Sequence, residues 1–187
     1  MINTTHRRAL FLDRDGVINV DHGYVSKIED FEFSEGIFSL LKLFRDAGYL
    51  LFIITNQSGI GRGYYKESDF HTLTEWMTEE FNTRGIIIEK VFHCPHTPDA
   101  GCCCRKPDIG MIEQALSEYS LDLEHSWMIG DKVSDITLAD NAGIGNSIYI
   151  GERTLPRVTL SFASVNGCAH YFQENQGKIS DTIKKIE

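Results

Sequence analysis

Residues 8–16 read RALFLDRDG, in which four apolar residues are followed by two carboxylates and a glycine. A short apolar run bounded by polar residues is typical of a strand buried on both faces of a parallel sheet. We therefore predict a first buried strand over residues 8–13. It would bring Asp13 to its carboxyl end and place Asp15, two residues on, on the same side of the chain.

The rest of the chain alternates similar runs with amphipathic helical patterns. Further strands are predicted over residues 48–55, 86–94, 126–130 and 147–150, and helices over about 37–47, 67–83, 109–119 and 133–142. This alternation predicts an α/β fold, Rossmann-like, with a mainly parallel sheet and helices on both faces. Ser68 is expected near a helix start, and Gly48 and Gly143 at helix ends. The pattern weakens after Ile150, and the tail from Gln173 is predicted to form a short closing helix or to fray.

Composition excludes several classes of protein. Of the 187 residues, 42% are hydrophobic and 24% charged, which suits one globular domain spanning 1–187. The net charge of -9 argues against nucleic-acid and anionic-membrane binding, since both rely on clustered Lys and Arg. No run approaches the roughly 18 apolar residues of a membrane span, and the first residues lack a secretory signal. We expect a cytoplasmic monomer.

Three predicted strands end on a polar residue, namely Asp13, Thr55 and Asp131. Ligands of open parallel sheets bind beyond the carboxyl ends of the strands, so these residues should converge. Mg²⁺ prefers oxygen ligands and usually takes few carboxylates. Asp13 and Asp131, with the backbone carbonyl of Asp15, are therefore candidate magnesium ligands.

The same residues suit phosphoryl transfer. Asp13 can act as a nucleophile that accepts the phosphoryl group, and Asp15 can protonate the leaving group and later activate water. Thr55, Asn56 and Lys106 can neutralise the oxygens of the transferring group. An isolated Asp-x-Asp is usually a turn or a solvated pair, but the combination at strand ends favours a phosphatase with Asp13, Asp15, Thr55 and Lys106 as catalytic residues.

Four of the five cysteines lie between residues 94 and 104, which is a poor disulfide framework and a good metal cluster. A closed structural zinc site, Cys₃His, is expected from Cys94, His96, Cys102 and Cys104. Cys103 should point away, although exchange with Cys102 stays open, and His93 competes with His96. The alternative is a set of reactive or buried thiols. Zinc would shape a loop that turns Arg105 and Lys106 toward the phosphate.

These motifs resemble those of the haloacid dehalogenase superfamily. Residues 13–16 match its first motif, Thr55-Asn56 the second, Lys106 the third, and Gly130-Asp131 with Asp135 the fourth. The resemblance covers about residues 8–150 and implies a magnesium-dependent phosphatase, because Asp15 carries the second acid of Asp-x-Asp. No long insertion follows Asp15 or Thr55, so we expect no separate cap domain.

The cysteine segment resembles two phosphatase families within the superfamily, which act on heptose 1,7-bisphosphate and on histidinol phosphate. Residues 21–25, 55–63, 73–77 and 130–132 favour the first. The resemblance therefore implies hydrolysis of the C7 phosphate of D-glycero-D-manno-heptose 1,7-bisphosphate in lipopolysaccharide or surface-glycan precursor synthesis. Histidinol-phosphate phosphatase, a non-enzymatic zinc-stabilised binding module, and a mutase or kinase remain alternatives.

The resemblance also implies substrate contacts, from Asp21, His22, Gly23, Tyr24, Thr55, Asn56, Gln57, Ser58, Arg105, Lys106 and Lys132. Charge complementarity supports part of this set, because Arg105 and Lys132 are not needed for the reacting phosphate and could bind a second one. Purely structural roles remain alternatives for two of these residues: Tyr24 could be a core aromatic, and Lys132 could be a surface lysine at a helix start. Asp135 is expected to position Lys106 or the metal's water shell rather than to bind metal directly.

Overall fold

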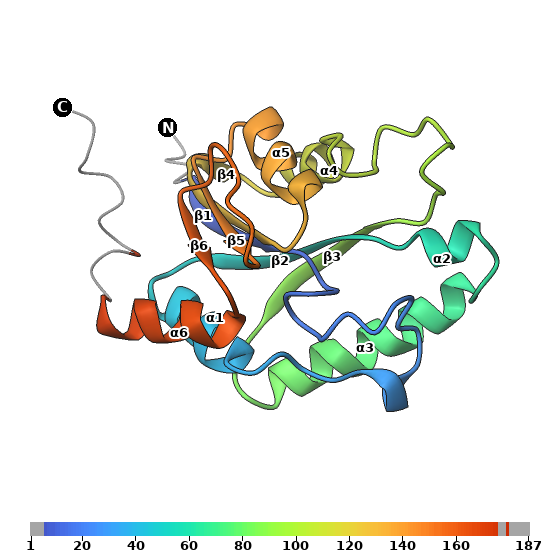
Figure 1. Ribbon diagram of the computed structural model, residues 1–187, viewed down its shortest axis with the longest axis horizontal. Coiled ribbons are helices and arrows are strands. Elements are labelled where there is room, and N and C mark those ends of the chain that lie inside the picture. Colours follow the sequence, from blue (N-terminus) through green and yellow to red (C-terminus); the bar gives the residue numbers. More distant parts are fainter. Residues whose placement is uncertain (1–5, 176–178, 180–187) are drawn as a thin grey trace.

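The computed structural model describes residues 6–175 and 179, and these fold around a parallel sheet (Figure 1). Its strands are ordered β3-β2-β1-β4-β5-β6, and every neighbouring pair is parallel. The strands are β1 Arg7–Leu12, β2 Leu50–Asn56, β3 Ile88–Cys94, β4 Leu121–Gly130, β5 Asn146–Ile150 and β6 Leu160–Phe162. The predicted parallel sheet is thus confirmed.

Helices cover both faces of the sheet. They are α1 Ile37–Asp46, α2 Ser58–Gly61, α3 Glu67–Asn82, α4 Gly110–Glu118, α5 Val133–Ala142 and α6 Val165–Glu174, with a short 3₁₀ helix at Ile28–Asp30. Figure 1 shows α1, α3 and α6 below the sheet and α4 and α5 above it. In the described part of the chain no inserted cap domain separates these elements, and none of its helices is long and apolar enough to cross a membrane.

The first strand explains why both faces are apolar. Leu10 and Leu12 pack into the core on the α1, α3 and α6 side, whereas Ala9 and Phe11 pack into the core under α4 and α5. All four are fully buried. Burying such a large apolar side chain contributes about 1.5–3 kcal/mol, so β1 anchors both layers.

Most predicted elements are confirmed, with shifts at their ends. The strand predicted from Ser126 begins earlier, at Leu121, and its pairing with β1 is irregular between Arg8 and Leu10. There the hydroxyl of Ser126 accepts the N–H of Ala9 at 2.8 Å, which replaces a backbone partner. The longer strand was missed because residues 121–125 are largely polar and lie toward the sheet's end.

The helix predicted over residues 67–83 is confirmed, but Ser68 lies inside its first turn and does not cap it. α3 begins at Glu67 with Lys66 as its N-cap, because the carboxylate of Asp69 accepts the Lys66 N–H at 2.8 Å. Gly143, with φ +73°, ends α5 as expected. Gly48, with φ +86°, follows the end of α1 as expected.

The last two elements were not predicted. β6 is only three residues long, and α6 begins after Ser164, whose hydroxyl accepts the N–H of Gly167 at 3.1 Å. Gln173 and Glu174 complete α6. The remainder of the predicted tail lies almost entirely outside the described residues.

Candidate active site

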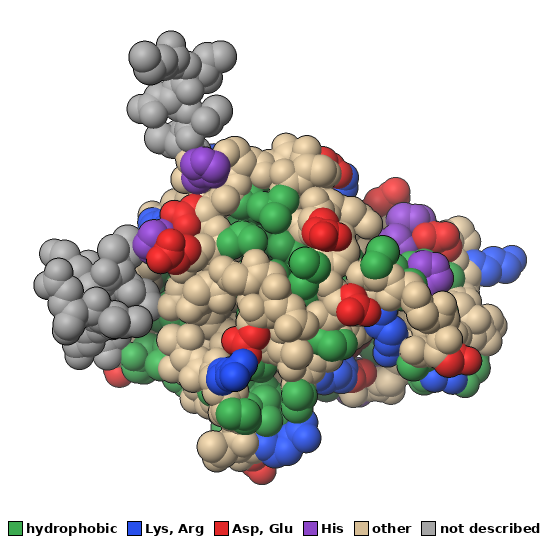
Figure 2. Space-filling model, turned by 90° about the horizontal axis from the view of Figure 1, so that it is seen from above, with side chains coloured by type: hydrophobic (Ala, Val, Ile, Leu, Met, Phe, Trp, Pro, Cys, Tyr) green, Lys and Arg blue, Asp and Glu red, His purple; other side chains and the backbone are tan. Residues whose placement is uncertain are grey.

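A cavity of about 380 Å³ opens at the carboxyl ends of β1, β2 and β4. Its lining draws on six separate segments of the chain: Asp13, Asp15, Asp21, Gly23, Tyr24, Asn56, Gln57, Ser58, Tyr65, Arg105, Lys106, Lys132 and Ser134. Most predicted substrate contacts are among these residues. The face shown in Figure 2 carries scattered Lys and Arg side chains and no continuous basic patch.

Asp13 follows β1 directly and is held from two sides. Its Oδ1 accepts the N–H of Arg14 at 2.8 Å and pairs with the Lys106 ammonium, also at 2.8 Å. Burial raises the pKa of Asp13 above its usual value, and the Lys106 charge acts against that rise. The carboxylate is therefore fixed in orientation, and its charge is partly offset by a lysine that it shares with Asp135.

Lys106 is itself buried between carboxylates. Its Nζ lies 2.7 Å from Asp135 Oδ1 and donates to the carbonyl of Ile54 at 2.9 Å. Burial alone would lower the pKa of Lys106, but Asp13 and Asp135 prevail and raise it. The side-chain amide of Asn56 brackets the lysine backbone, accepting its N–H at 3.0 Å and donating to its carbonyl at 3.3 Å. Lys106 is thus a permanent, positioned cation.

Asp15 is aligned by Arg14, to which the sequence analysis assigned no role. Arg14 Nη2 lies 2.9 and 3.0 Å from the two Asp15 oxygens and also donates to the carbonyl of Val25 at 2.6 Å. The arginine is only 1% exposed, which is rare for this residue type. Its place between two aspartates, directly after an apolar strand, was the signal available in the sequence.

A second chain of hydrogen bonds reaches Asp15 from β2. Gln57 Nε2 donates to Asp15 Oδ2 at 3.0 Å and to Thr55 Oγ1 at 2.8 Å. The Tyr65 hydroxyl donates to Gln57 Oε1 at 2.5 Å, which orients the amide. Burial raises the pKa of Tyr65 to about 12. Gln57 therefore links the acid/base candidate to the threonine, and Tyr65, which no motif indicated, holds it there.

Asp131 adds a carboxylate with little compensation. Its oxygen lies within 4.8 Å of those of Asp13 and Asp135, and its Oδ1 is buried without a hydrogen-bond partner, 3.7 Å from Lys132 Nζ. Burial and the Asp13 charge raise the pKa of Asp131 to about 7, against the effect of Lys132. Since Lys106 and the Lys132 N–H already bind Asp135, the free oxygens of Asp13 and Asp131 suit a divalent cation.

A glycine makes room for this arrangement. A Cβ on Gly16 would lie 2.3 Å from Asp131 Oδ2, and its φ of +90° is itself unfavourable for other residues. The glycine that closes the opening motif is therefore required by its close approach to the carboxylate after β4.

Of the remaining predicted substrate contacts, some line the cavity and others lie outside it. Lys132 Nζ lies 3.3 Å from Asp21 Oδ2 across the cavity. Tyr24 is half exposed, at 50%, and packs edge-on against Tyr64, so it is not a core residue. The His22 ring lies outside this cavity, with Nε2 3.1 Å from Glu32 Oε2. The Thr55 side chain is almost wholly buried beneath the cavity and does not line it.

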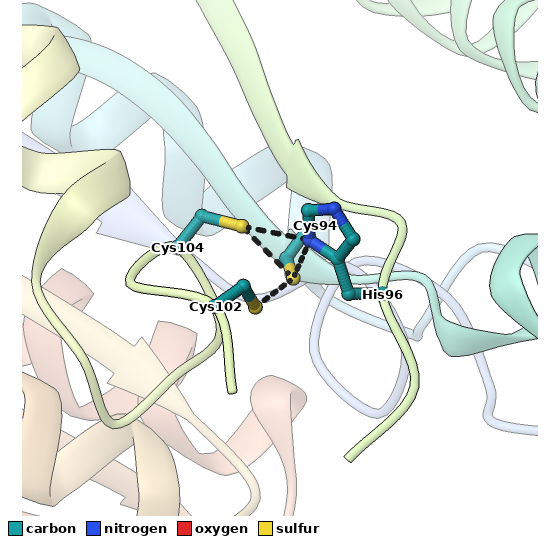
Figure 3. Close-up of side chains that lie close together, drawn as sticks. All are labelled: Cys94, His96, Cys102 and Cys104. Carbon is teal, nitrogen blue, oxygen red and sulfur yellow. Dashed lines mark hydrogen bonds between the residues drawn. The ribbon is translucent and has the colours of Figure 1, made fainter. Parts of the chain in front are cut away.

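The four predicted zinc ligands lie together at the end of β3 and in the loop that follows it (Figure 3). Cys94 Sγ is 3.6 Å from Cys102 Sγ, 3.1 Å from Cys104 Sγ and 3.5 Å from His96 Nδ1. A tetrahedral zinc ion with bonds of about 2.3 Å to sulfur separates its sulfur ligands by roughly 3.8 Å. The donor set and spacing therefore fit zinc after small adjustments. Cys103 is exposed and outside the cluster.

The thiols differ in their tendency to ionise. Burial raises the pKa of Cys94 to about 12. At Cys102 burial acts in the same direction, but hydrogen bonds with the Cys94 and Cys104 sulfurs prevail and lower its pKa to about 7. The loop continues from Cys104 directly into Arg105 and Lys106, so its conformation sets two of the cations that line the cavity.

Comparisons with known proteins agree with the predicted fold and family. A family model described as HAD-hydrolase-like matches residues 103–149. The D-glycero-alpha-D-manno-heptose-1,7-bisphosphate 7-phosphatase of Campylobacter jejuni is 56% identical over 145 residues, which are 78% of this chain and 83% of that protein. The D-glycero-beta-D-manno-heptose-1,7-bisphosphate 7-phosphatase of Haemophilus ducreyi is 44% identical over 77% of this chain and 83% of that protein.

Among solved structures, the chain is similar to D,D-heptose 1,7-bisphosphate phosphatase from B. bronchiseptica, a complex with magnesium and phosphate. The TM-score is 0.79 at 26% identity, and the alignment covers 90% of this chain and 99% of the other.

Proposed function

The chain belongs to the haloacid dehalogenase-like hydrolases, and from this premise we propose that it hydrolyses the C7 phosphate of D-glycero-D-manno-heptose 1,7-bisphosphate. The products are heptose 1-phosphate and inorganic phosphate, for use in surface-glycan heptose precursors. The observation that carries the reaction is the setting of Asp13, a buried carboxylate at the cavity floor, 2.8 Å from the Lys106 ammonium.

The residues divide the reaction into two steps. Asp13 attacks phosphorus and forms an aspartyl-phosphate, while Asp15 gives its proton to the departing C7 oxygen. Asp15 then takes a proton from the water that attacks the aspartyl-phosphate, which releases phosphate and restores both carboxyl groups. Arg14 and Gln57 keep Asp15 in place for both transfers.

The charge on the transferring group is offset by residues already in position. Lys106 and Asn56 line the cavity and can donate to the oxygens of this group. The Thr55 hydroxyl, just beneath the cavity, accepts from Gln57 Nε2, so its own proton is free to be donated to the same group. Mg²⁺, held by Asp13, Asp131 and the backbone carbonyl of Asp15, would supply the positive charge that lets a phosphate dianion approach a carboxylate. Asp131 Oδ1, which is buried without a hydrogen-bond partner, supports this assignment.

The zinc assignment rests on the donor set. Cys94, His96, Cys102 and Cys104 form a closed Cys₃His arrangement, which leaves no position for substrate and so suits a structural ion. Such an ion would hold the loop that presents Arg105 and Lys106.

The second phosphate of the substrate distinguishes the candidate reactions. Arg105 and Lys132 line the cavity and offer two cations to a phosphate that does not react. The ammonium of histidinol phosphate would meet these cations unfavourably, so a bisphosphate is the better fit. The relatives named above point the same way, and the positioned Asp13, Asp15 and Lys106 favour an enzyme over a binding module.

Phosphate release from heptose 1,7-bisphosphate in the presence of Mg²⁺ tests the proposal. We expect release from wild type with both anomers or one of them, little from histidinol phosphate, and at least about a 10³-fold loss in Asp13→Asn. Asp46→Asn, an exposed carboxylate in α1, is the matched control and should keep wild-type activity. No release by wild type, or unchanged release in Asp13→Asn, refutes the enzymatic function; a preference for histidinol phosphate refutes the substrate.

A further inference from the structure

A second group of metal-binding side chains lies outside the cavity and outside the cysteine cluster. Glu67, His71 and His93 each bring one ligand atom within 4.8 Å of the others. Glu67 and His71 come from the first turns of α3, and His93 comes from β3. None of the three lines the active-site cavity.

The backbone places these side chains on one surface. Glu67 and His71 are four residues apart on α3, so they share a helix face. His93 precedes Cys94 in β3, and neighbouring strand residues point to opposite faces of a sheet. The His93 ring therefore faces α3, whereas Cys94 faces the other side and joins the cysteine cluster.

Contacts within the group limit its freedom. His93 Nε2 lies 2.9 Å from Glu67 Oε1, and the His93 ring packs against the Phe70 ring at a tilt of 32°, with ring centres 4.3 Å apart. The rings of His71 and His93 are nearly perpendicular, at 88°, with centres 5.7 Å apart. Two imidazoles bound to one ion through nitrogen bonds of about 2.1 Å hold their ring centres roughly 5 Å apart. Small side-chain rotations would thus complete the geometry.

We propose that Glu67, His71 and His93 form a solvent-accessible site for a divalent transition-metal ion, with Zn²⁺ as the best match. Two imidazoles and one carboxylate suit Zn²⁺ and its neighbours, and three protein ligands leave a position for water. The Glu67 side chain is 53% exposed and that of His93 17%, so an ion can enter from solvent. A bound ion would tie the start of α3 to the end of β3, and this does not depend on the proposed phosphatase function.

The third donor separates this group from ordinary surface pairs. His125 Nδ1 lies 2.7 Å from Asp122 Oδ2 in a similar histidine–carboxylate pair. Within the described residues, that pair is not completed by a third metal-binding side chain. His125→Ala is therefore a matched control for His71→Ala.

Calorimetric titration of untagged protein with Zn²⁺ tests the site. The protein is first given one equivalent of zinc, its metal content is measured, and Mg²⁺ is kept saturating so that the aspartates of the cavity are occupied. We expect His71→Ala and Glu67→Gln each to bind Zn²⁺ at this site at least about tenfold more weakly than wild type. Under the titration conditions, wild type should therefore bind one ion more than His71→Ala. His125→Ala should bind like wild type. The difference of one ion holds whether or not the cysteine cluster retains zinc.

Paramagnetic Ni²⁺ locates the ion independently. It should broaden the NMR signals of the Phe70 ring in wild type and not in His71→Ala, while circular dichroism verifies that the variant is folded. The site does not exist if wild type and His71→Ala bind the same number of ions with the same affinity, or if His125→Ala loses as much as His71→Ala.

Discussion

Replacing Lys106 by methionine keeps most of the side-chain volume but removes the ammonium from between two buried carboxylates. Lys106 Nζ lies 2.8 Å from Asp13 Oδ1 and 2.7 Å from Asp135 Oδ1, and the three side chains are at most 6% exposed. In Lys106→Met both carboxylates would remain in a site with little access to water, and the carbonyl of Ile54 would lose its donor.

The expected cost follows from this burial. Removing one partner of a buried ion pair typically costs about 3–5 kcal/mol, because an uncompensated charge stays behind. Lys132→Met is the matched control, since its side chain is 51% exposed and lies 3.3 Å from Asp21. Exposed pairs contribute about 0–1 kcal/mol. The two lysine variants should therefore differ in unfolding free energy by at least about 2 kcal/mol.

Urea unfolding followed by circular dichroism, without added Mg²⁺, measures both variants at one pH. Asp135→Asn and the double variant Lys106→Met/Asp135→Asn complete a double-mutant cycle. Loss of the lysine should cost less once one carboxylate is neutral, by about 0.5–3 kcal/mol. Strict additivity in the cycle, or a Lys106→Met protein as stable as Lys132→Met, would show that Lys106 does not compensate these carboxylates.

Three further changes have specific outcomes. We expect Mg²⁺ to raise the Tm of wild type and Asp131→Asn to abolish that rise; a variant whose Tm rises as much as that of wild type would contradict the assigned ligand. Gly16→Ala should lower the unfolding free energy in urea more than Gly48→Ala does, because both glycines have φ near +90° but only Gly16 faces a carboxylate. Equal losses near 1 kcal/mol would mean that backbone strain is the sole cause. Tyr65→Phe should lose less unfolding free energy than wild type as the pH rises above 10. Burial raises the pKa of Tyr65 from 10.0 to about 12, so the native phenol keeps its proton while the unfolded one ionises. The stabilisation from this pKa difference is present below pH 10 and is lost as pH rises toward 12. Urea midpoints at pH 9 and pH 11 that shift equally in wild type and Tyr65→Phe would rule out this linkage.

Local sequence patterns predicted the sheet because they report burial. The apolar run before Asp13 could only be stable between two helix layers, and its two neighbouring acids then had to lie at the strand end. The same reasoning placed Thr55 and Asp131 at the same edge. It missed β6, which is only three residues long, and α6, although Val165, Cys168, Ala169 and Phe172 repeat at helical spacing.

Tertiary structure decided which polar side chains act together, because in loops the direction of a side chain depends on partners distant in sequence. Tyr24 lines the cavity, whereas His22, two residues earlier, pairs with Glu32 outside it. The sequence by itself determined the sheet, the acids at its edge and the thiols that could share a metal. Only packing over long separations joined Gln57 to Asp15 and Lys106 to Asp13, because hydrogen bonds and ion pairs across the fold leave no periodic trace in the chain.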